Sequence, residues 1–336
     1  RRRQAAARGG PTRIGLGLAC YLQGSGLGPY EGATVRVDPS GAVVVLVGVA
    51  AQGQGHATSL AQICAAELGV ALEDVSVVGG DTQVMPFGMG TGGSRVAANA
   101  GPAVARSARA VREKASRVAA ELLECAPGDV RIAEGRAFVA GVPGRAVPLG
   151  RVARAAIRAE ALRGSAEPGL TSCSYFYPDT VTWAFGAHAA AVEVDLETCL
   201  TRLLAYVAVH DSGRPINPMI VEGQLQGGIV QGIGAGLGET LVYDAAGQLL
   251  TGSLMDYPLP RADDLPPLGS FIVETVDHPS AVNELGIKGV GESGAIAPAA
   301  AIANAVEDAL AEFRITIRDV PVTPGRLFAL LHHGGT

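Results

Sequence analysis

LGIKGVGESGAIAPAAAIANAVEDAL, residues 285–310, is the stretch from which the rest of the chain is best interpreted. One carboxylate, Glu292, lies among four glycines just before an apolar segment. Glycine accepts positive φ and carries no Cβ, so such a loop lets the backbone come close to a bound group. Pro298 suits the first turn of a helix, where its missing N–H costs nothing. Large apolar residues then recur at spacings of four, four and three, which predicts one buried helical face: Ile302, Val306, Leu310 and Phe313.

The position of Glu292 supports two interpretations. A lone acid on a glycine loop facing a helix N-terminus suits a general base, because the loop can present the carboxylate to a substrate. The same acid would also suit a helix entry, where it interacts with the positive end of the helix dipole. The local pattern leaves both interpretations open.

The GVGESG loop and the AIANAVEDAL segment behind it resemble the end of the molybdenum-binding subunit of the xanthine oxidase family of molybdenum hydroxylases. Within that family, the resemblance is greatest to bacterial large subunits of the aerobic carbon monoxide dehydrogenase type. The glutamate of this loop is, in the family, the base that deprotonates the metal-bound hydroxide. The resemblance therefore implies that Glu292 is catalytic and that Gly289 and Gly291 bind the cofactor.

A second glycine loop, GQGH, follows a valine-rich segment that predicts a buried strand, and precedes a segment with helical spacing of its leucines. Free N–H groups in the first turn of a helix make such a corner suitable for an anion, although a glycine loop alone is weak support for one. The loop resembles the family's first pterin-binding loop, in which the glutamine contacts the cofactor. The resemblance implies cofactor contacts for Gly53, Gln54, Gly55 and His56.

A third candidate loop, TGGSR, closes the segment 81–95. Two hydroxyls and the exposed N–H groups of two glycines suit a polar, anionic ring system that carries a phosphate. The alternative is an Ω-loop in which serine and threonine only stabilise local turns. The segment resembles the one that wraps the pyranopterin in the family, which implies that four residues bind the cofactor: Thr91, Gly92, Gly93 and Ser94.

The fourth motif, DSGRPINPMIVEGQLQGGIVQGIG at 211–234, predicts a helix that begins near Asn217. Its glutamines interrupt an apolar, glycine-rich face, and buried amides need hydrogen-bond partners that a heteroatom-rich cofactor can supply. The run resembles the family's second pterin-binding segment. The resemblance gives the cofactor-contacting glutamine as Gln231, and Gln224 is a further candidate.

Composition excludes several classes of function. The net charge of −6 and the scattered basic residues argue against a nucleic-acid surface. The five cysteines form no CxxC pair, so neither a zinc site nor an iron–sulfur cluster is predicted, and free thiols point to a reducing cytoplasm. No run of 18 apolar residues predicts a membrane span. We predict no protein-ligated metal; in the family, molybdenum is held by the pterin dithiolene.

The 336 residues predict two domains, with a boundary at the Gly- and Pro-containing connector around 164–171. We expect an α+β fold built of two mixed subdomains of the family's cofactor-binding domain. Residues 1–165 would carry the GQGH and TGGS loops, and 166–336 the QGGIVQGIG and GVGESG loops. Strands are expected at 182–195, 201–209, 271–275 and 315–320, and helices at 98–124, 148–162 and 325–331. Core positions are expected for Trp183, Phe185 and Tyr206.

The resemblance implies a cytoplasmic molybdenum-cofactor subunit that oxidises an aldehyde, an N-heteroaromatic compound or carbon monoxide. The cofactor would be molybdopterin, as in bacterial relatives its cytosine dinucleotide. Electrons would pass to iron–sulfur clusters and FAD on partner chains. The family's other cofactor loop, GGGFG-like, does not occur in this sequence, so a separate N-terminal half of the subunit is a further expected partner. Two alternatives remain: a non-catalytic scaffold half that only completes the cofactor pocket, and a phosphate-binding protein without redox chemistry.

Overall fold

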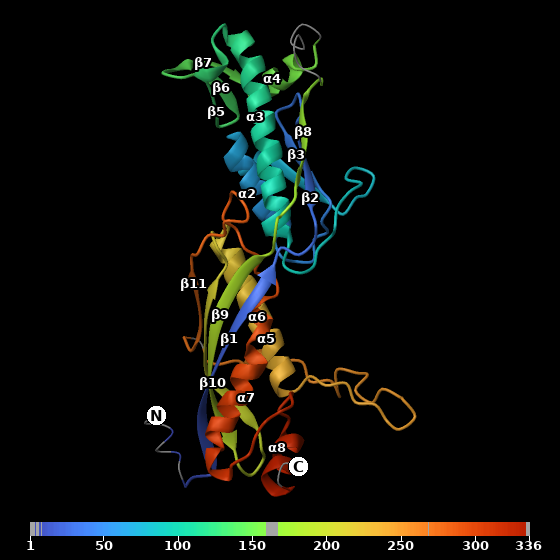
Figure 1. Ribbon diagram of the computed structural model, residues 1–336, viewed down its shortest axis with the longest axis vertical. Helices are drawn as coiled ribbons and strands as arrows, with labels where there is room; N and C mark the ends of the chain where they lie inside the picture. Colours follow the sequence, from blue (N-terminus) through green and yellow to red (C-terminus); the bar gives the residue numbers. More distant parts are fainter. Residues whose placement is uncertain (1–3, 5–6, 8, 159–166, 268, 334–336) are drawn as a thin grey trace.

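The computed structural model describes the chain apart from residues 1–3, 5–6, 8, 159–166, 268 and 334–336. Three sheets and several helices make up an elongated molecule (Figure 1). Sheet A has the order β1-β9-β10-β11, sheet B β4-β3-β2-β8 and sheet C β5-β6-β7. The mixture of helices and open sheets confirms the predicted α+β fold.

The strands of sheet A are β1 (Thr12–Ser25), β9 (Thr182–Asp195), β10 (Thr201–Asp211) and β11 (Phe271–Val276). Those of sheet B are β4 (Val75–Gly79), β3 (Val43–Val47), β2 (Glu31–Val37) and β8 (Leu170–Phe176). Sheet C holds β5 (Val130–Ala133), β6 (Arg136–Val139) and β7 (Val142–Pro148). Neighbours pair antiparallel except β10/β11 and β3/β4, which are parallel.

The helices are α2 (His56–Leu68), α3 (Gly101–Leu123), α4 (Leu149–Ala155) and α5 (Pro218–Leu237), followed by α6 (Ser293–Ile296), α7 (Pro298–Ala309) and α8 (Pro324–His333). A π-helical turn, Val96–Ala100, leads into α3. One apolar core lies between sheet B and helices α2 and α3, and a second lies between sheet A and helices α5 and α7. Within the described residues, no helix is both long and apolar enough to cross a membrane.

Sheets A and B each contain one edge strand that comes from the other half of the sequence. The N-terminal strand β1 pairs over its whole length with β9, and β8 pairs with β2. Sheet A therefore takes its edge strand from the first half of the chain, and sheet B takes one from beyond residue 165. The division into 1–165 and 166–336 stays a prediction, and β1 and β8 both cross it.

Helix α7 lies directly on β1 because two residues of the strand have no side chain. A Cβ on Gly15 would lie 1.9 Å from the carbonyl oxygen of Ala305, and one on Gly17 would lie 2.0 Å from that of Ala301. Asn304 and Asp308 of the same helix also hydrogen-bond the backbone of β1. This contact places the glycine loop before α7 at the end of sheet A.

Several sequence predictions need correction. Phe313 is 43% exposed because α7 ends at Ala309, and a 3-10 turn then changes the helical spacing. Trp183 and Phe185 are 52% and 40% exposed, since they occupy the outward positions of β9, whose buried positions are the alternate ones. Tyr206 is fully buried, as predicted.

Two predicted segments also differ. No strand forms at 315–320, where the N–H of Ile317 donates to the Glu307 carboxylate and pairs with no strand. The helix predicted over 148–162 ends at Ala155; its last four positions and the start of the predicted connector lie outside the described residues.

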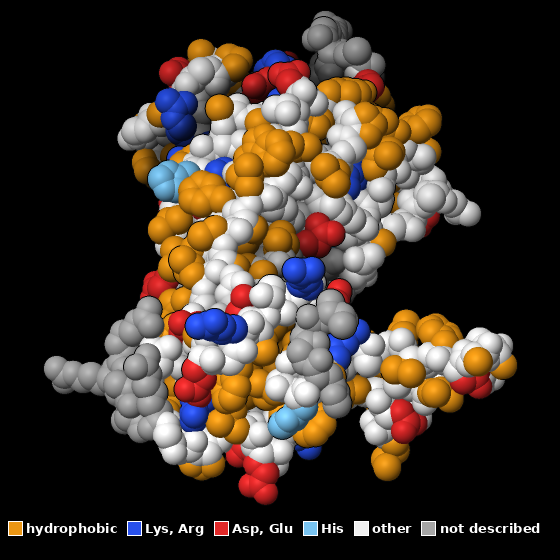
Figure 2. Space-filling model, turned by 60° about the horizontal axis from the view of Figure 1, so that its bottom comes forward, with side chains coloured by type: hydrophobic (Ala, Val, Ile, Leu, Met, Phe, Trp, Pro, Cys, Tyr) orange, Lys and Arg blue, Asp and Glu red, His pale blue; other side chains and the backbone are white. Residues whose placement is uncertain are grey.

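Residues 239–260 form an arm that projects from the end of α5 (Figure 1). Its apolar side chains are strongly exposed, with Leu254 at 80% and Met255 at 94%. In Figure 2 the projection on the right carries several hydrophobic side chains. The outward face of sheet A is also apolar and exposes Leu18, Leu22 and Trp183.

Two histidines are buried on the inward face of sheet A. His188 Nδ1 lies 2.8 Å from the Tyr206 hydroxyl and His210 Nδ1 lies 2.8 Å from the Tyr21 hydroxyl. Both rings are fully buried, and this burial lowers the pKa of each histidine to about 4. Both are therefore neutral at pH 7.

The histidines predict an acid-sensitive fold. An unfolded histidine has a pKa of about 6.5, so below that pH the unfolded chain binds more protons than the native one. Stability from the neutral rings is complete above about pH 6.5 and falls as the pH drops toward about 4, by roughly 2 kcal/mol per ring between pH 7.5 and 5. Urea unfolding at both pH values measures this change. A His188→Gln, His210→Gln double variant should lose less stability over that interval; an equal loss would contradict the prediction.

Candidate functional site

Four segments converge on one pocket of about 170 Å³. They are the loop before α2, the TGGSR loop, the segment from Ser212 into α5, and the loop before α6. Nine of the residues predicted from the sequence line it: Gln54, His56, Thr91, Gly92, Ser94, Gln224, Gly289, Gly291 and Glu292. Residues more than 200 positions apart in sequence thus share one cavity.

Four predicted residues do not line the pocket. Gly53, Gly55 and Gly93 each adjoin a lining residue and have positive φ, so they shape the loops. Gln231 is exposed, two helical turns beyond Gln224 on α5. Seven residues of α-helix span about 10 Å, which carries Gln231 past the end of the pocket. The cofactor role assigned to it remains a prediction.

Glu292 is held by Ser94 of the TGGSR loop. The Ser94 hydroxyl donates to Glu292 Oε2 over 2.7 Å, and the Glu292 N–H donates back to Ser94 Oγ over 3.1 Å. Glu292 is solvent-exposed and stands at the N-terminus of α6 as its N-cap, although its side chain makes no capping hydrogen bond. The carboxylate thus faces the pocket and contacts the other candidate loop.

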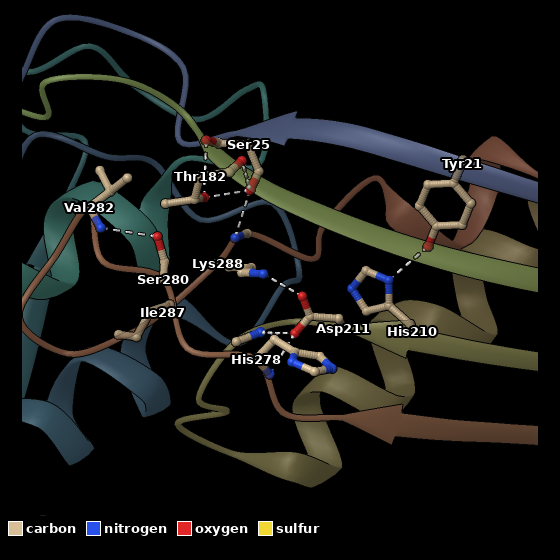
Figure 3. Close-up of polar contacts among 12 residues, drawn as sticks. Tyr21, Ser25, Thr182, His210, Asp211, His278, Ser280, Val282, Ile287 and Lys288 are labelled. Atoms are coloured by element: carbon tan, nitrogen blue, oxygen red, sulfur yellow. Dashed lines mark hydrogen bonds and ion pairs between the residues drawn. The ribbon is translucent and has the colours of Figure 1, made fainter.

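Gly289 brings two loops into direct contact. A Cβ at this position would lie 1.8 Å from the carbonyl oxygen of Ser94, so no other residue fits without moving the backbone. The Gly289 N–H donates to Ser25 Oγ over 2.9 Å, and Ser25 in turn hydrogen-bonds Thr182 on the adjacent strand. Figure 3 shows this Ser25–Thr182 pair beside the Lys288 segment.

Replacing Gly289 by Ala should separate the two loops. Backbone atoms cannot yield as a flexible side chain would, and overpacking of this kind costs about 1–3 kcal/mol. We expect the Gly289→Ala variant to unfold at lower urea concentration and to lose cofactor. Gly144→Ala is the matched control, because nothing lies within 4 Å of a Cβ there and Gly144 does not line the pocket. Equal stability and cofactor content in the two variants would contradict this account.

Arg95 anchors the TGGSR loop from beneath. Its guanidinium forms an ion pair with the fully buried Glu31 carboxylate and donates to the carbonyl oxygens of Leu27, Tyr30 and Gly90. Arg95 itself is only 4% exposed. In the sequence Arg95 is only the last residue of the TGGSR motif, and its structural role was not predicted.

A second buried ion pair lies under the loop before α6. Lys288 Nζ contacts Asp211 Oδ2, and Asp211 Oδ1 accepts the N–H groups of Gly213 and His278. Figure 3 shows the Lys288 amine pointing at the Asp211 carboxylate. Lys288 also lines the pocket. Sequence reasoning missed this pair because its members are 77 positions apart.

The lining suits an anionic ligand rich in heteroatoms. His56 Nδ1 and Ser212 Oγ are inaccessible to solvent and have no hydrogen-bond partner among the described residues. Burial lowers the pKa of His56, so its ring is neutral and can both donate and accept a hydrogen bond. Cationic Arg214 and Lys288 and the amides of Gln54 and Gln224 complete the wall. Arg214, Ser212 and Asn217 were not predicted, although all three lie within or beside the fourth motif.

These features fit a bound molybdopterin. Unpaired polar atoms, amide side chains and cationic groups meet the ring heteroatoms and phosphate of such a molecule, and glycine loops admit its bulk. No group of three or more potential metal-ligating side chains occurs among the described residues. Fold and site together define a mixed α/β domain in which glycine loops from distant segments form one pocket with a carboxylate at its wall.

The chain belongs to the molybdopterin cofactor-binding domain family, whose model matches residues 1–266. It is 39% identical over 339 residues to the nicotine 6-hydroxylase large subunit of Paenarthrobacter nicotinovorans, covering 97% of this chain and 41% of that protein. It is 35% identical over 322 residues to the carbon monoxide dehydrogenase large chain of Afipia carboxidovorans, covering 92% and 39%. The family resemblance inferred from the motifs is thereby confirmed.

Solved structures agree. Quinoline 2-oxidoreductase from Pseudomonas putida 86 superposes with a TM-score of 0.88 at 40% identity, covering 98% of this chain and 43% of that one. Cu,Mo-CO dehydrogenase superposes with a TM-score of 0.87 at 33% identity, covering 98% and 43%. The chain therefore spans about two fifths of the length of the relatives it matches.

Proposed function

We propose that this chain is the half of the molybdenum subunit of a multi-subunit hydroxylase that carries the general base, Glu292. The observation that carries the proposal is the meeting of the Glu292 loop with the TGGSR and GQGH loops at one pocket. The substrate would be an aldehyde, an N-heteroaromatic compound or carbon monoxide. Relatives named for nicotine, quinoline and carbon monoxide support that range.

Each protein group has a defined task in this proposal. The cofactor, when bound, supplies the two-electron oxidising centre. Gln54, Thr91, Gly92 and Gln224 bind and orient it through amide, hydroxyl and backbone groups. Glu292 accepts a proton at Oε1, since Ser94 donates to Oε2 and no described residue donates to the other oxygen. A positioned carboxylate of this kind contributes about 10²–10⁴-fold as a general base.

The finer assignments are part of the same proposal. The pterin would be the cytosine dinucleotide form. A separate chain would supply the remainder of the molybdenum subunit, and iron–sulfur and FAD chains would carry electrons away. The names of relatives as large subunits support an assembly of several chains. A cytoplasmic location would keep the five free cysteines reduced.

The alternative is a scaffold half that completes the pocket without taking part in chemistry. The exposed carboxylate at the pocket wall favours the catalytic version, because a scaffold has no need of an acid there. The two versions differ in whether turnover depends on Glu292.

Elemental analysis tests the proposal directly. The complex would be purified through a tag on this chain, and molybdenum and iron measured per copy. We expect about one molybdenum per chain, with iron and further subunits present. A folded, fully assembled preparation without molybdenum would overturn the proposal and leave the glycine loops as ordinary turns.

A further inference from the structure

Neighbouring groups occupy every hydrogen-bonding position of the Ser94 hydroxyl. It accepts two hydrogen bonds, from the Glu292 N–H and from Gln23 Nε2, each over 3.1 Å. A serine hydroxyl has two acceptor positions and one proton. With both acceptor positions taken, the proton has one remaining partner, Glu292 Oε2 at 2.7 Å.

Gln23 is itself held in one orientation. It lies on β1 and is 8% exposed, and its Oε1 accepts a hydrogen bond from the Ser293 hydroxyl. Ser293 is fully buried at the start of α6, one residue after Glu292. Because Oε1 faces Ser293, the amide nitrogen faces Ser94; in the reverse orientation the Ser94 hydroxyl would have to donate to Gln23 and would lose its hydrogen bond to Glu292.

Backbone geometry indicates that Ser94 is held there against a local preference. Its φ is +50°, in the left-handed region that non-glycine residues seldom adopt. Such a conformation is disfavoured for a residue with a side chain and persists where the surroundings impose it. The Gly289 contact and the Gln23 hydrogen bond are surroundings of that kind.

We propose that Gln23 is a positioning residue that acts through Ser94 to fix the Glu292 carboxylate in its working orientation. This inference rests on the proposed role of Glu292 as general base. Ser293 donates to Gln23, Gln23 donates to Ser94, and Ser94 donates to Glu292. This chain of hydrogen bonds joins β1, the TGGSR loop and α6. The structure thereby assigns a site function to a strand that contributes no residue to the pocket lining.

Gln23→Met tests the proposal, because methionine keeps the length of the side chain and removes its donor and acceptor. In the assembled complex we expect kcat to fall roughly 10- to 100-fold, with KM and molybdenum content unchanged. The control is Asn304→Leu, which removes a different hydrogen bond to β1, the one that α7 donates to Leu18. Its kcat should match that of the wild type.

Two further measurements separate positioning from general destabilisation. In the cofactor-free chain, hydrogen exchange at the Glu292 amide should accelerate in Gln23→Met, since that N–H donates to Ser94. In a Ser94→Ala background, Gln23→Met should lower kcat no further, because its effect passes through Ser94.

The role of Gln23 and the general-base role of Glu292 can fail separately in these experiments. Full activity in Glu292→Gln would contradict the proposed function, in which Glu292 is the general base. An inactive Glu292→Gln variant beside a Gln23→Met variant with wild-type kcat and exchange would overturn only the role of Gln23. Additive losses in the Ser94→Ala background would overturn it too.

Discussion

Glu292→Gln is expected to reduce kcat by about 10²–10⁴-fold, the contribution of a positioned general base. The substitution is isosteric, and its amide oxygen can still accept the hydrogen bond that Ser94 donates. The loop should therefore keep its conformation and the complex its cofactor. Glutamine lacks a basic oxygen, so only proton transfer is removed.

Steady-state kinetics and molybdenum analysis on the same preparation check this result. Glu222→Gln is a matched control: it makes the same chemical change at an exposed position on α5, where the carboxylate accepts a hydrogen bond from the Gln226 amide. We expect wild-type kcat from that variant. Undiminished turnover in Glu292→Gln at full molybdenum content would favour the scaffold alternative.

Arg95→Met is expected to destabilise the fold by about 3–5 kcal/mol, because it leaves the Glu31 carboxylate buried without its partner. Glu31 would retain only the N–H groups of Gly32 and Met89, each at 3.2 Å. Three carbonyl oxygens would also lose the hydrogen bond that Arg95 donates. The TGGSR loop should detach, and cofactor should be lost with it.

Urea unfolding of the isolated chain gives the free energy for this comparison. Arg106→Met removes an exposed arginine from its ion pair with Glu284 and should cost at most about 1 kcal/mol. Adding Glu31→Leu to Arg95→Met should recover part of the loss, since no charge then remains buried. Equal costs for the two arginine variants would contradict the role given to Arg95.

Local signals in the sequence were strong enough to predict most helices and strands and nine of the residues that line the pocket. Asn217-Pro218 begins α5 as expected, and the Asn217 side chain accepts the N–H of Ile220 as an N-cap. Two of the four glycine motifs lie where another backbone approaches closely, as Gly289 and Gly228 show. These features depend on few neighbouring residues, so a single sequence can reveal them.

Long-range contacts could not be predicted in the same way. Nothing near Gln23 indicates that it meets Ser94 and Ser293, and the ion pairs of Arg95 and Lys288 each join distant segments. Trp183 was misplaced for a related reason. Alternation along β9 shows that its two faces differ, but only the position of α7 decides which one is buried.

The pairing of β1 with β9 has a consequence for synthesis on the ribosome. Ser25 and Thr182, which end the pairing, are 157 positions apart, so at about 5–20 residues per second β1 must wait roughly 10–30 s for its partner. During that time its leucines and its backbone are unpaired and open to wrong partners. Strand β1 is thus made long before it can find its place, and chaperone binding at residues 12–25 would protect the chain during this delay.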